Sequence, residues 1–77
     1  MKNVIIYSTP TCVYCKMAKE FFKEHNVPYT EHDVAADLEK RQEMVEKTGQ
    51  LGVPVIQVEN TVMVGFSKDK LSQALGV

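Results

Sequence analysis

The sequence predicts an α/β domain with the element order β-α-β-α-β-β-α and a four-stranded mixed sheet flanked by helices. Three observations lead to this fold class. The chain opens with an apolar segment, an amphipathic segment and a second extended segment. A helical segment follows. The chain then closes with a hairpin and a last amphipathic segment. A length of 77 residues suits one compact core, so we expect a single domain over residues 1–77.

The first three elements form a β-α-β unit. Residues 4–7 are a continuous apolar run, typical of a strand that is buried on both faces. Residues 13–25 have helical periodicity, and their apolar positions are Tyr14, Ala18, Phe21 and Phe22. Residues 28–33, with Pro28 at the start, favour a second strand. Because the crossover has the length of a helix, these two strands are expected to be parallel.

The next segment predicts a second helix over residues 36–48. It is rich in strong helix formers, with Leu38, Met44 and Val45 as its apolar positions. Gly49 follows directly and is expected to end the helix as a C-terminal cap.

The last part of the chain predicts a hairpin and a short helix. Residues 52–58 read as a buried strand entered through Pro54, and a tight turn at residues 59–60 leads into a strand over residues 61–64. Ser67 can cap a final helix, whose apolar face consists of Leu71, Ala74 and Leu75.

Composition excludes several classes of function. The formal net charge is −1, and Lys and Arg do not cluster, so a nucleic-acid partner is not expected. The apolar run at the start is far shorter than a signal-peptide core or the roughly 20 residues that span a bilayer. We therefore expect a cytoplasmic protein without a membrane partner, and a monomer.

Both cysteines of the chain lie in the stretch "PTCVYCK", as Cys12 and Cys15. Two cysteines at this spacing can bind a metal, form a structural disulfide or exchange electrons. Thr11 is a candidate N-cap of the following helix, which places Cys12 at the helix mouth, where the helix dipole favours a thiolate. Cys15 falls on nearly the same helix face, one turn deeper. Lys16 adds a positive charge nearby, although such a lysine is most often solvated.

The alternatives to redox chemistry have less support. A zinc site would also need His25 and His32, and the resulting spacing C-x2-C-x9-H-x6-H lies outside the finger pattern. A disulfide that closes so short a loop is a poor structural staple. An inert pair of buried cysteines is common in general, but a C-x-x-C at a strand-to-helix junction within a β-α-β pattern favours redox chemistry.

Three separated motifs resemble the glutaredoxin family, which has the thioredoxin fold. They are "YSTPTCVYCK", "TGQLGVPVI" and "VGFSKDKL", and they occur in the family's order over nearly the whole chain. The resemblance implies a thiol–disulfide oxidoreductase that reduces protein or glutathione mixed disulfides, with no bound metal or organic cofactor. Cys12 would be the attacking thiol and Cys15 the resolving one. A non-catalytic metal-binding or adaptor module is the rival from another class.

The resemblance also implies a substrate-binding surface around the cysteines. The Val53–Pro54 bond would be cis, and the Val53 backbone would pair with an extended substrate segment, as in strand addition. The other residues expected on this surface are Thr11, Val13, Tyr14, Gly65, Phe66 and Asp69.

Departures from the family pattern bear on the electron donor. Many glutathione-using members have a lysine shortly before the first cysteine and a Gly-Gly pair before the last helix, where this chain has Thr9-Pro10 and Gly65-Phe66. Phe66 would obstruct or reshape the glutathione surface. Together with Val13, it resembles small redoxins that accept electrons from thioredoxin reductase and serve ribonucleotide reductase. Asp69 can meet a cationic amino group or the helix dipole. Glutathione and thioredoxin reductase therefore both remain candidate electron sources.

Overall fold

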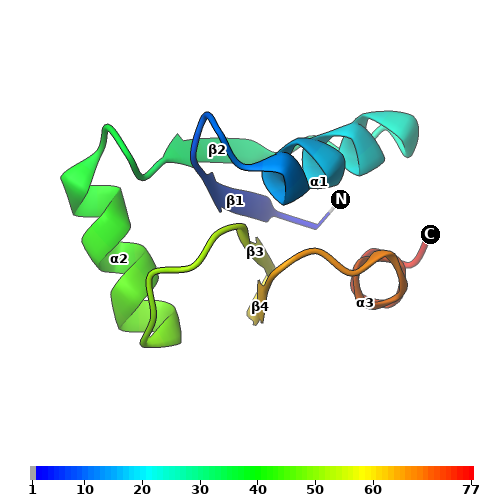
Figure 1. The fold of residues 1–77 in the computed structure, drawn as a ribbon. Coiled ribbons are helices and arrows are strands. Elements are labelled where there is room, and N and C mark those ends of the chain that lie inside the picture. Colours follow the sequence, from blue (N-terminus) through cyan, green and yellow to red (C-terminus); the bar gives the residue numbers. More distant parts are fainter. Residues whose placement is uncertain (1) are drawn as a thin grey trace.

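The computed structural model describes residues 2–77. The elements in chain order are β1 (Val4–Ser8), α1 (Val13–Glu24), β2 (Thr30–Asp33), α2 (Leu38–Thr48), β3 (Val55–Val58), β4 (Thr61–Val64) and α3 (Lys68–Leu75). Figure 1 shows this arrangement, which has the order β-α-β-α-β-β-α that the sequence predicts. Within residues 2–77, no helix is both long and apolar enough to cross a membrane.

Three elements begin later than predicted. β2 begins at Thr30 and β3 at Val55 rather than at residues 28 and 52, in each case after a proline, which has no N–H for the sheet. α2 begins at Leu38 rather than at residue 36, because the Asp37 carboxylate accepts the Lys40 N–H at 3.2 Å and caps the helix there.

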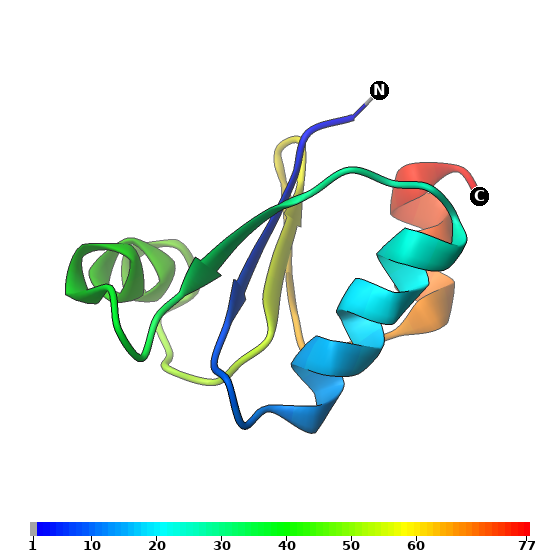
Figure 2. The same cartoon turned by 90° about the horizontal axis from the view of Figure 1, so that it is seen from above.

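The sheet has the strand order β2-β1-β3-β4. β1 pairs in parallel with β2, as the helix-length crossover predicts, and antiparallel with β3. β3 and β4 form the predicted antiparallel hairpin. α2 covers one face of the sheet, and α1 and α3 lie together on the other (Figure 2). The result is the predicted three-layer arrangement of a mixed sheet between helices.

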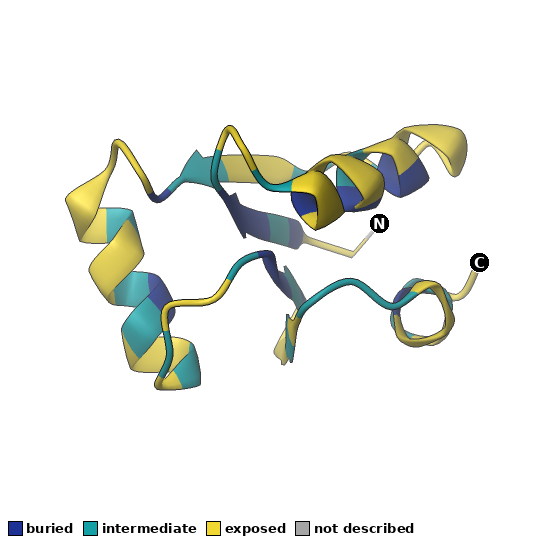
Figure 3. Cartoon of the chain, viewed as in Figure 1, coloured by how far each residue is buried: buried dark blue, intermediate teal, exposed yellow. Residues whose placement is uncertain are grey.

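The two faces of the sheet carry two separate apolar clusters. The larger cluster packs beneath α1 and α3 and comprises Val4, Ile6, Ala18, Phe21, Phe22, Ile56, Val58 and Leu71. The smaller one packs beneath α2 and comprises Tyr7, Val34, Met44 and Val55. In Figure 3 the inward sides of α1 and β1 are buried, whereas much of α2 is exposed. The cysteine-bearing helix therefore rests on the larger of the two cores.

Two residues predicted to lie on buried helix faces are exposed. Tyr14 is 60% exposed, because it lies in the first turn of α1, where Cys15 rather than Tyr14 turns inward. Leu38 is 68% exposed, because it is the first residue of α2, and the buried residue of that helix is Met44, one turn and a half further on. At the other predicted positions, Ala18, Phe21, Phe22, Met44 and Leu71 are buried, whereas Val45, Ala74 and Leu75 are only partly buried.

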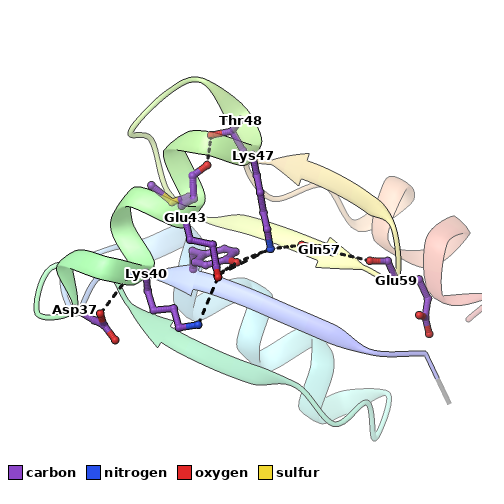
Figure 4. A network of polar contacts seen from close by, with 9 residues as sticks. Asp37, Lys40, Glu43, Lys47, Thr48, Gln57 and Glu59 are labelled. Atoms are coloured by element: carbon purple, nitrogen blue, oxygen red, sulfur yellow. Dashed lines mark hydrogen bonds and ion pairs between the residues drawn. The ribbon is translucent and has the colours of Figure 1, made fainter.

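A polar network ties α2 to the sheet (Figure 4). The buried Tyr7 hydroxyl donates to Glu43 and accepts a hydrogen bond from the Lys47 ammonium at 2.8 Å. Lys47 also donates to Gln57 of β3 at 2.7 Å. Burial, followed by the hydrogen bond to Glu43, raises the pKa of Tyr7. The network supplies partners for the one polar atom that the Tyr7 ring carries into the smaller core.

Candidate active site

Cys12 itself caps the N-terminus of α1. Its backbone is extended, with φ −84° and ψ 113°, and its Sγ accepts the Cys15 N–H at 3.1 Å. The prediction that Thr11 is the N-cap is therefore wrong: Thr11 lies one residue too early, and it is exposed. A sulfur in this position receives one of the otherwise unpaired amides of the first helical turn, which stabilises negative charge on it.

Cys15 is fully buried, whereas Cys12 is partly exposed, and both are free thiols. Burial is the main cause that raises the pKa of the Cys15 thiol to about 12, and its hydrogen bond with Cys12 adds to this. A backbone hydrogen bond from Thr9 and the positive charge of Lys19 act in the opposite direction. The two sulfurs thus occupy unequal surroundings, and the prediction that Cys15 lies deeper is confirmed.

The loop before β3 has the cis Val53–Pro54 bond that the resemblance implies. Pro54 is buried, Val53 is half-buried, and the Pro54 carbonyl accepts the Gly65 N–H at 2.8 Å. Tyr7 pairs with Val55 in the antiparallel register, so this loop enters the sheet at the end of β1 from which the cysteine loop leaves. No backbone–backbone hydrogen bond within residues 2–77 uses the Val53 N–H or carbonyl.

The segment before α3 is anchored to α1 through an aromatic contact. Gly65 has φ +88°, a conformation that favours glycine, and it turns the chain out of β4. The half-buried Phe66 ring packs edge-on against Phe21, with 6.2 Å between the ring centroids. The predicted Ser67 cap is confirmed, since its hydroxyl accepts the Lys70 N–H at 3.4 Å. Asp69 is exposed in the first turn of α3.

Val13 and Tyr14 form an exposed apolar surface beside Cys12. They are 66% and 60% exposed and are the first two residues of α1. Side chains of this size that remain in solvent next to a partly exposed thiol provide an apolar contact area for a docking partner.

Three polar residues near Cys15 were not singled out from the sequence: Ser8, Lys19 and Glu31. Lys19 lies one turn beyond Cys15 on α1, and its charge acts on the Cys15 thiol, whereas Lys16 is exposed and points elsewhere. The i, i+4 spacing from Cys15 was a signal that could have identified Lys19. Glu31 joins the group only because β2 pairs with β1, and its sequence position carries no such signal.

The two histidines lie in other parts of the fold. His25 ends α1 and stacks on Phe21, with 4.4 Å between ring centroids, while His32 lies on β2 and faces Tyr7 at 5.5 Å. In the described part of the chain, no group of three or more His, Cys, Asp or Glu residues is placed to hold a metal ion.

Comparisons with known proteins agree with this geometry. The glutaredoxin family model matches residues 4–63. The chain is 41% identical to an uncharacterized glutaredoxin-like 8.6 kDa protein in the rubredoxin operon of Clostridium pasteurianum, over 91% of this chain and 93% of the relative. It is 30% identical to the glutaredoxin-like protein NrdH of Lactococcus lactis, over 91% of this chain and 96% of the relative.

A solved structure extends the match to the whole chain. The crystal structure of a variant of the thioredoxin-like protein BC3987 superposes with a TM-score of 0.92 and 34% identity, covering 100% of this chain and 99% of that one. The family model covers most of the sequence. The chain is therefore a thioredoxin-fold thiol–disulfide oxidoreductase of the glutaredoxin family.

Proposed function

We propose that the protein reduces disulfides in two steps, with Cys12 as the attacking thiol and Cys15 as the resolving one. The observation that carries the proposal is the inequality of the two sulfurs: Cys12 is partly exposed and accepts a helix amide at 3.1 Å, whereas Cys15 is fully buried. An incoming disulfide can reach only the first sulfur directly. The second lies one helical turn away, with its backbone N–H bonded to the Cys12 sulfur, and can attack that sulfur once a mixed disulfide has formed.

The reaction balances as a two-electron transfer. The Cys12 thiolate attacks one sulfur of the substrate disulfide, a new S–S bond forms, and the first substrate thiol leaves. Cys15 loses its proton and attacks the Cys12 sulfur, which forms the Cys12–Cys15 disulfide and releases the second substrate thiol. The dithiol of the protein is oxidised and the substrate disulfide is reduced.

We propose that the substrate is an extended protein segment that carries a disulfide. The Val53 N–H and carbonyl, which take part in no backbone–backbone hydrogen bond of residues 2–77, support pairing with such a segment. Val13 and Tyr14 offer apolar contact beside Cys12. Asp69, exposed in the first turn of α3, is a candidate partner for a cationic group of the substrate.

Serine variants test the two roles. Cys12→Ser is expected to abolish reduction of a protein disulfide, and Cys15→Ser to accumulate a mixed disulfide with substrate that non-reducing electrophoresis and mass spectrometry detect. Retained reductase activity in Cys12→Ser would contradict the proposal. If Cys15→Ser turned over a protein disulfide as fast as the wild type, Cys15 would have no resolving role.

The electron donor defines two candidate functions. A glutathione-reduced glutaredoxin is the first. The second is a redoxin that thioredoxin reductase reduces and that donates electrons to ribonucleotide reductase. Phe66 favours the second, because its ring, packed against Phe21, occupies the position where many glutathione-using members have glycine. The similarity to the NrdH protein of Lactococcus lactis over nearly its full length also supports it. Both donors operate in the cytoplasm, which we propose as the compartment.

A direct comparison of donors decides between them. The oxidised protein is offered NADPH with either glutathione and glutathione reductase or thioredoxin reductase, and the loss of NADPH absorbance gives the two rates. We expect faster reduction by thioredoxin reductase, and Phe66→Gly is expected to raise the glutathione-dependent rate. Fast reduction by glutathione alone would assign the first function instead.

A further inference from the structure

A second polar cluster lies on the α1 side of the sheet, next to Cys15. We call it the α1-side trio: Ser8 at the end of β1, Glu31 on β2 and Lys19 on α1. A single oxygen of Glu31, Oε2, accepts both the Ser8 hydroxyl at 2.7 Å and the Lys19 ammonium at 2.8 Å. Three different elements therefore meet at one carboxylate oxygen.

The trio is more constrained than an ordinary surface ion pair. Ser8 is only 1% exposed, so its hydroxyl has a fixed direction and needs a partner within the protein. Glu31 is opposite Ile6 in the parallel register, which sets its side chain on the face that α1 covers. Since Ser8 and the β1–β2 pairing hold the carboxylate, the carboxylate in turn holds the Lys19 ammonium on the inner side of α1.

Lys19 lies four residues after Cys15, so the two side chains are neighbours on one helix face. The ammonium lowers the pKa of the Cys15 thiol, against the larger effect of burial. A hollow of about 350 Å³ beside the trio is lined by Ser8, Thr9, Pro10, Lys19, Glu31 and Asp33. Thr9 is also the residue whose backbone hydrogen-bonds Cys15. The hollow thus exposes Lys19 and Glu31 to solvent, while Cys15 itself stays buried.

We propose that Lys19 stabilises the Cys15 thiolate during the resolving step, and that Glu31 and Ser8 are positioning residues that hold Lys19 there. The inference rests on the proposed two-step function. Cys15 releases its proton to solvent, and the lysine charge offsets the new negative charge. The thiolate attacks the Cys12 sulfur of the mixed disulfide, the Cys12–Cys15 bond forms, and the departing substrate thiolate takes a proton from solvent.

The charged groups around Cys15 come from two elements. On α1 these are Lys19 itself, Lys16 on the exposed side, and Lys23, which acts on Glu31. On β2 they are Glu31 and Asp33. The other titratable neighbour is Cys12, which carries no charge once it is in a mixed disulfide. Within this set, Lys19 is the positive charge that acts on Cys15 directly.

The resolving step can be measured by itself. The reduced protein is mixed with a symmetrical aromatic disulfide whose released thiolate is coloured, so Cys12 attack gives a first release and Cys15 attack a second. Both phases are recorded by stopped flow between pH 6 and pH 9.5. The variants are Lys19→Gln, Lys19→Arg and Glu31→Gln, and Lys16→Gln is the matched control on the exposed side of the same helix.

We expect Lys19→Gln to move the pH profile of the second phase upward by about half to one pH unit, as for a partly exposed charge near a thiol. The second phase should slow by about twofold to fourfold near neutral pH, because the higher basicity of the thiolate partly compensates for its lower population. The first phase should stay unchanged. Lys19→Arg should restore the profile, and Glu31→Gln should shift it by less than Lys19→Gln.

The outcomes separate this inference from the proposed function. Two phases in the wild type, with a second-phase profile that Lys19→Gln leaves unchanged, would overturn the role of Lys19 and keep the two-step mechanism. An equal slowing by Lys16→Gln would also overturn it, since general loss of positive charge would then be the cause. A wild type without a second phase would overturn both proposals. Thermal unfolding of each variant checks that the fold is retained.

Discussion

Tyr7 and Ser8 are consecutive residues of β1 that point to opposite faces of the sheet, and each belongs to a hydrogen-bonded group with a glutamate and a lysine. The α2-side trio consists of Tyr7, Glu43 and Lys47, and the α1-side trio of Ser8, Glu31 and Lys19. The same three chemical groups therefore occur twice, on either side of one strand. Only the second trio lies beside a cysteine.

The two trios differ in which group is central. On the α2 side the phenol is central, because it donates to Glu43 and accepts from Lys47, while its ring fills the smaller core. On the α1 side the carboxylate is central, and the small serine leaves an open hollow of about 350 Å³. The Tyr7 ring thus fills the core on the α2 side, whereas the small serine on the α1 side leaves room for solvent beside Lys19 and Glu31.

Among changes to the two trios, removal of the Tyr7 side chain should cause the largest loss of stability. The ring is fully buried, so Tyr7→Ala leaves a cavity under α2 and is expected to lower the free energy of unfolding by about 3–5 kcal/mol. Urea unfolding followed by circular dichroism measures the change. A loss below about 1 kcal/mol would mean that α2 collapses onto the vacated space, and the packing role of this trio would be wrong.

The fold and the cysteine site were predictable because their signals are local in the sequence. The helical spacing of Ala18, Phe21 and Phe22, the Gly49 cap and the Ser67 cap each depend on a few neighbouring residues, and the structure confirms them. The C-x-x-C spacing likewise sets Cys15 one turn below Cys12. Helix faces and caps depend on residues that are close together in the chain, so the sequence alone predicts them.

The features that sequence reasoning missed depend on tertiary pairing or on unusual chemistry. Glu31 reaches Lys19 only through the β1–β2 register, which no local pattern contains. Thr11 was expected to cap α1 because hydroxyls are the usual caps, but the sulfur of Cys12 takes that place. Tyr14 fits an apolar helical stripe, yet the first turn of α1 is exposed to solvent. An apolar side chain beside a functional residue therefore need not belong to the core.

Removing only the hydroxyl of Tyr7 should lower the stability by a smaller amount, which depends on pH. Tyr7→Phe is expected to lower the free energy of unfolding by about 1 kcal/mol near pH 7, since Glu43 and Lys47 regain water. The raised pKa of Tyr7 means that its contribution is complete below the ordinary value of 10.0 and is lost as the pH rises above it. The difference between the variant and the wild type should therefore shrink above pH 10. Urea unfolding at pH 7 and pH 10.5 measures it, and a constant difference would contradict the raised pKa.

Removing the hydroxyl of Ser8 sharpens the comparison between the trios. Ser8→Ala is expected to lower the free energy of unfolding by about 0.5–1 kcal/mol, because Glu31 keeps Lys19 as a partner. It should also slow the second phase of the coloured-disulfide assay, because Glu31 then holds Lys19 less firmly, whereas Tyr7→Phe should leave that phase unchanged. Second-phase rates equal to the wild type in both variants would show that Ser8 does not position Lys19.

Replacing either glutamate should cause the smallest losses of stability, and these losses should vanish at low pH. Lys19 and then Ser8 hold the pKa of Glu31 below its ordinary value of 4.5, and the Tyr7 hydroxyl is the main group that does the same for Glu43. A lowered folded-state pKa stabilises the fold above the ordinary value, and that contribution is lost as the pH falls through the lowered one. Both side chains are more than one third exposed, so solvent screens the effect.

Glu31→Gln and Glu43→Gln should each lower the free energy of unfolding by a few tenths of a kcal/mol, at about the size of exposed ion pairs. Each difference from the wild type should be present at pH 7, should shrink as the pH falls below 4.5, and should disappear only below the lowered pKa, where the wild-type carboxyl is protonated as well. Urea unfolding measured from pH 7 downward gives the two differences. The variants should behave alike in this experiment, and only Glu31→Gln should also shift the second-phase pH profile. A shift of equal size in Glu43→Gln would mean that net charge, and not the place of the trio beside Cys15, sets the reactivity of that thiol.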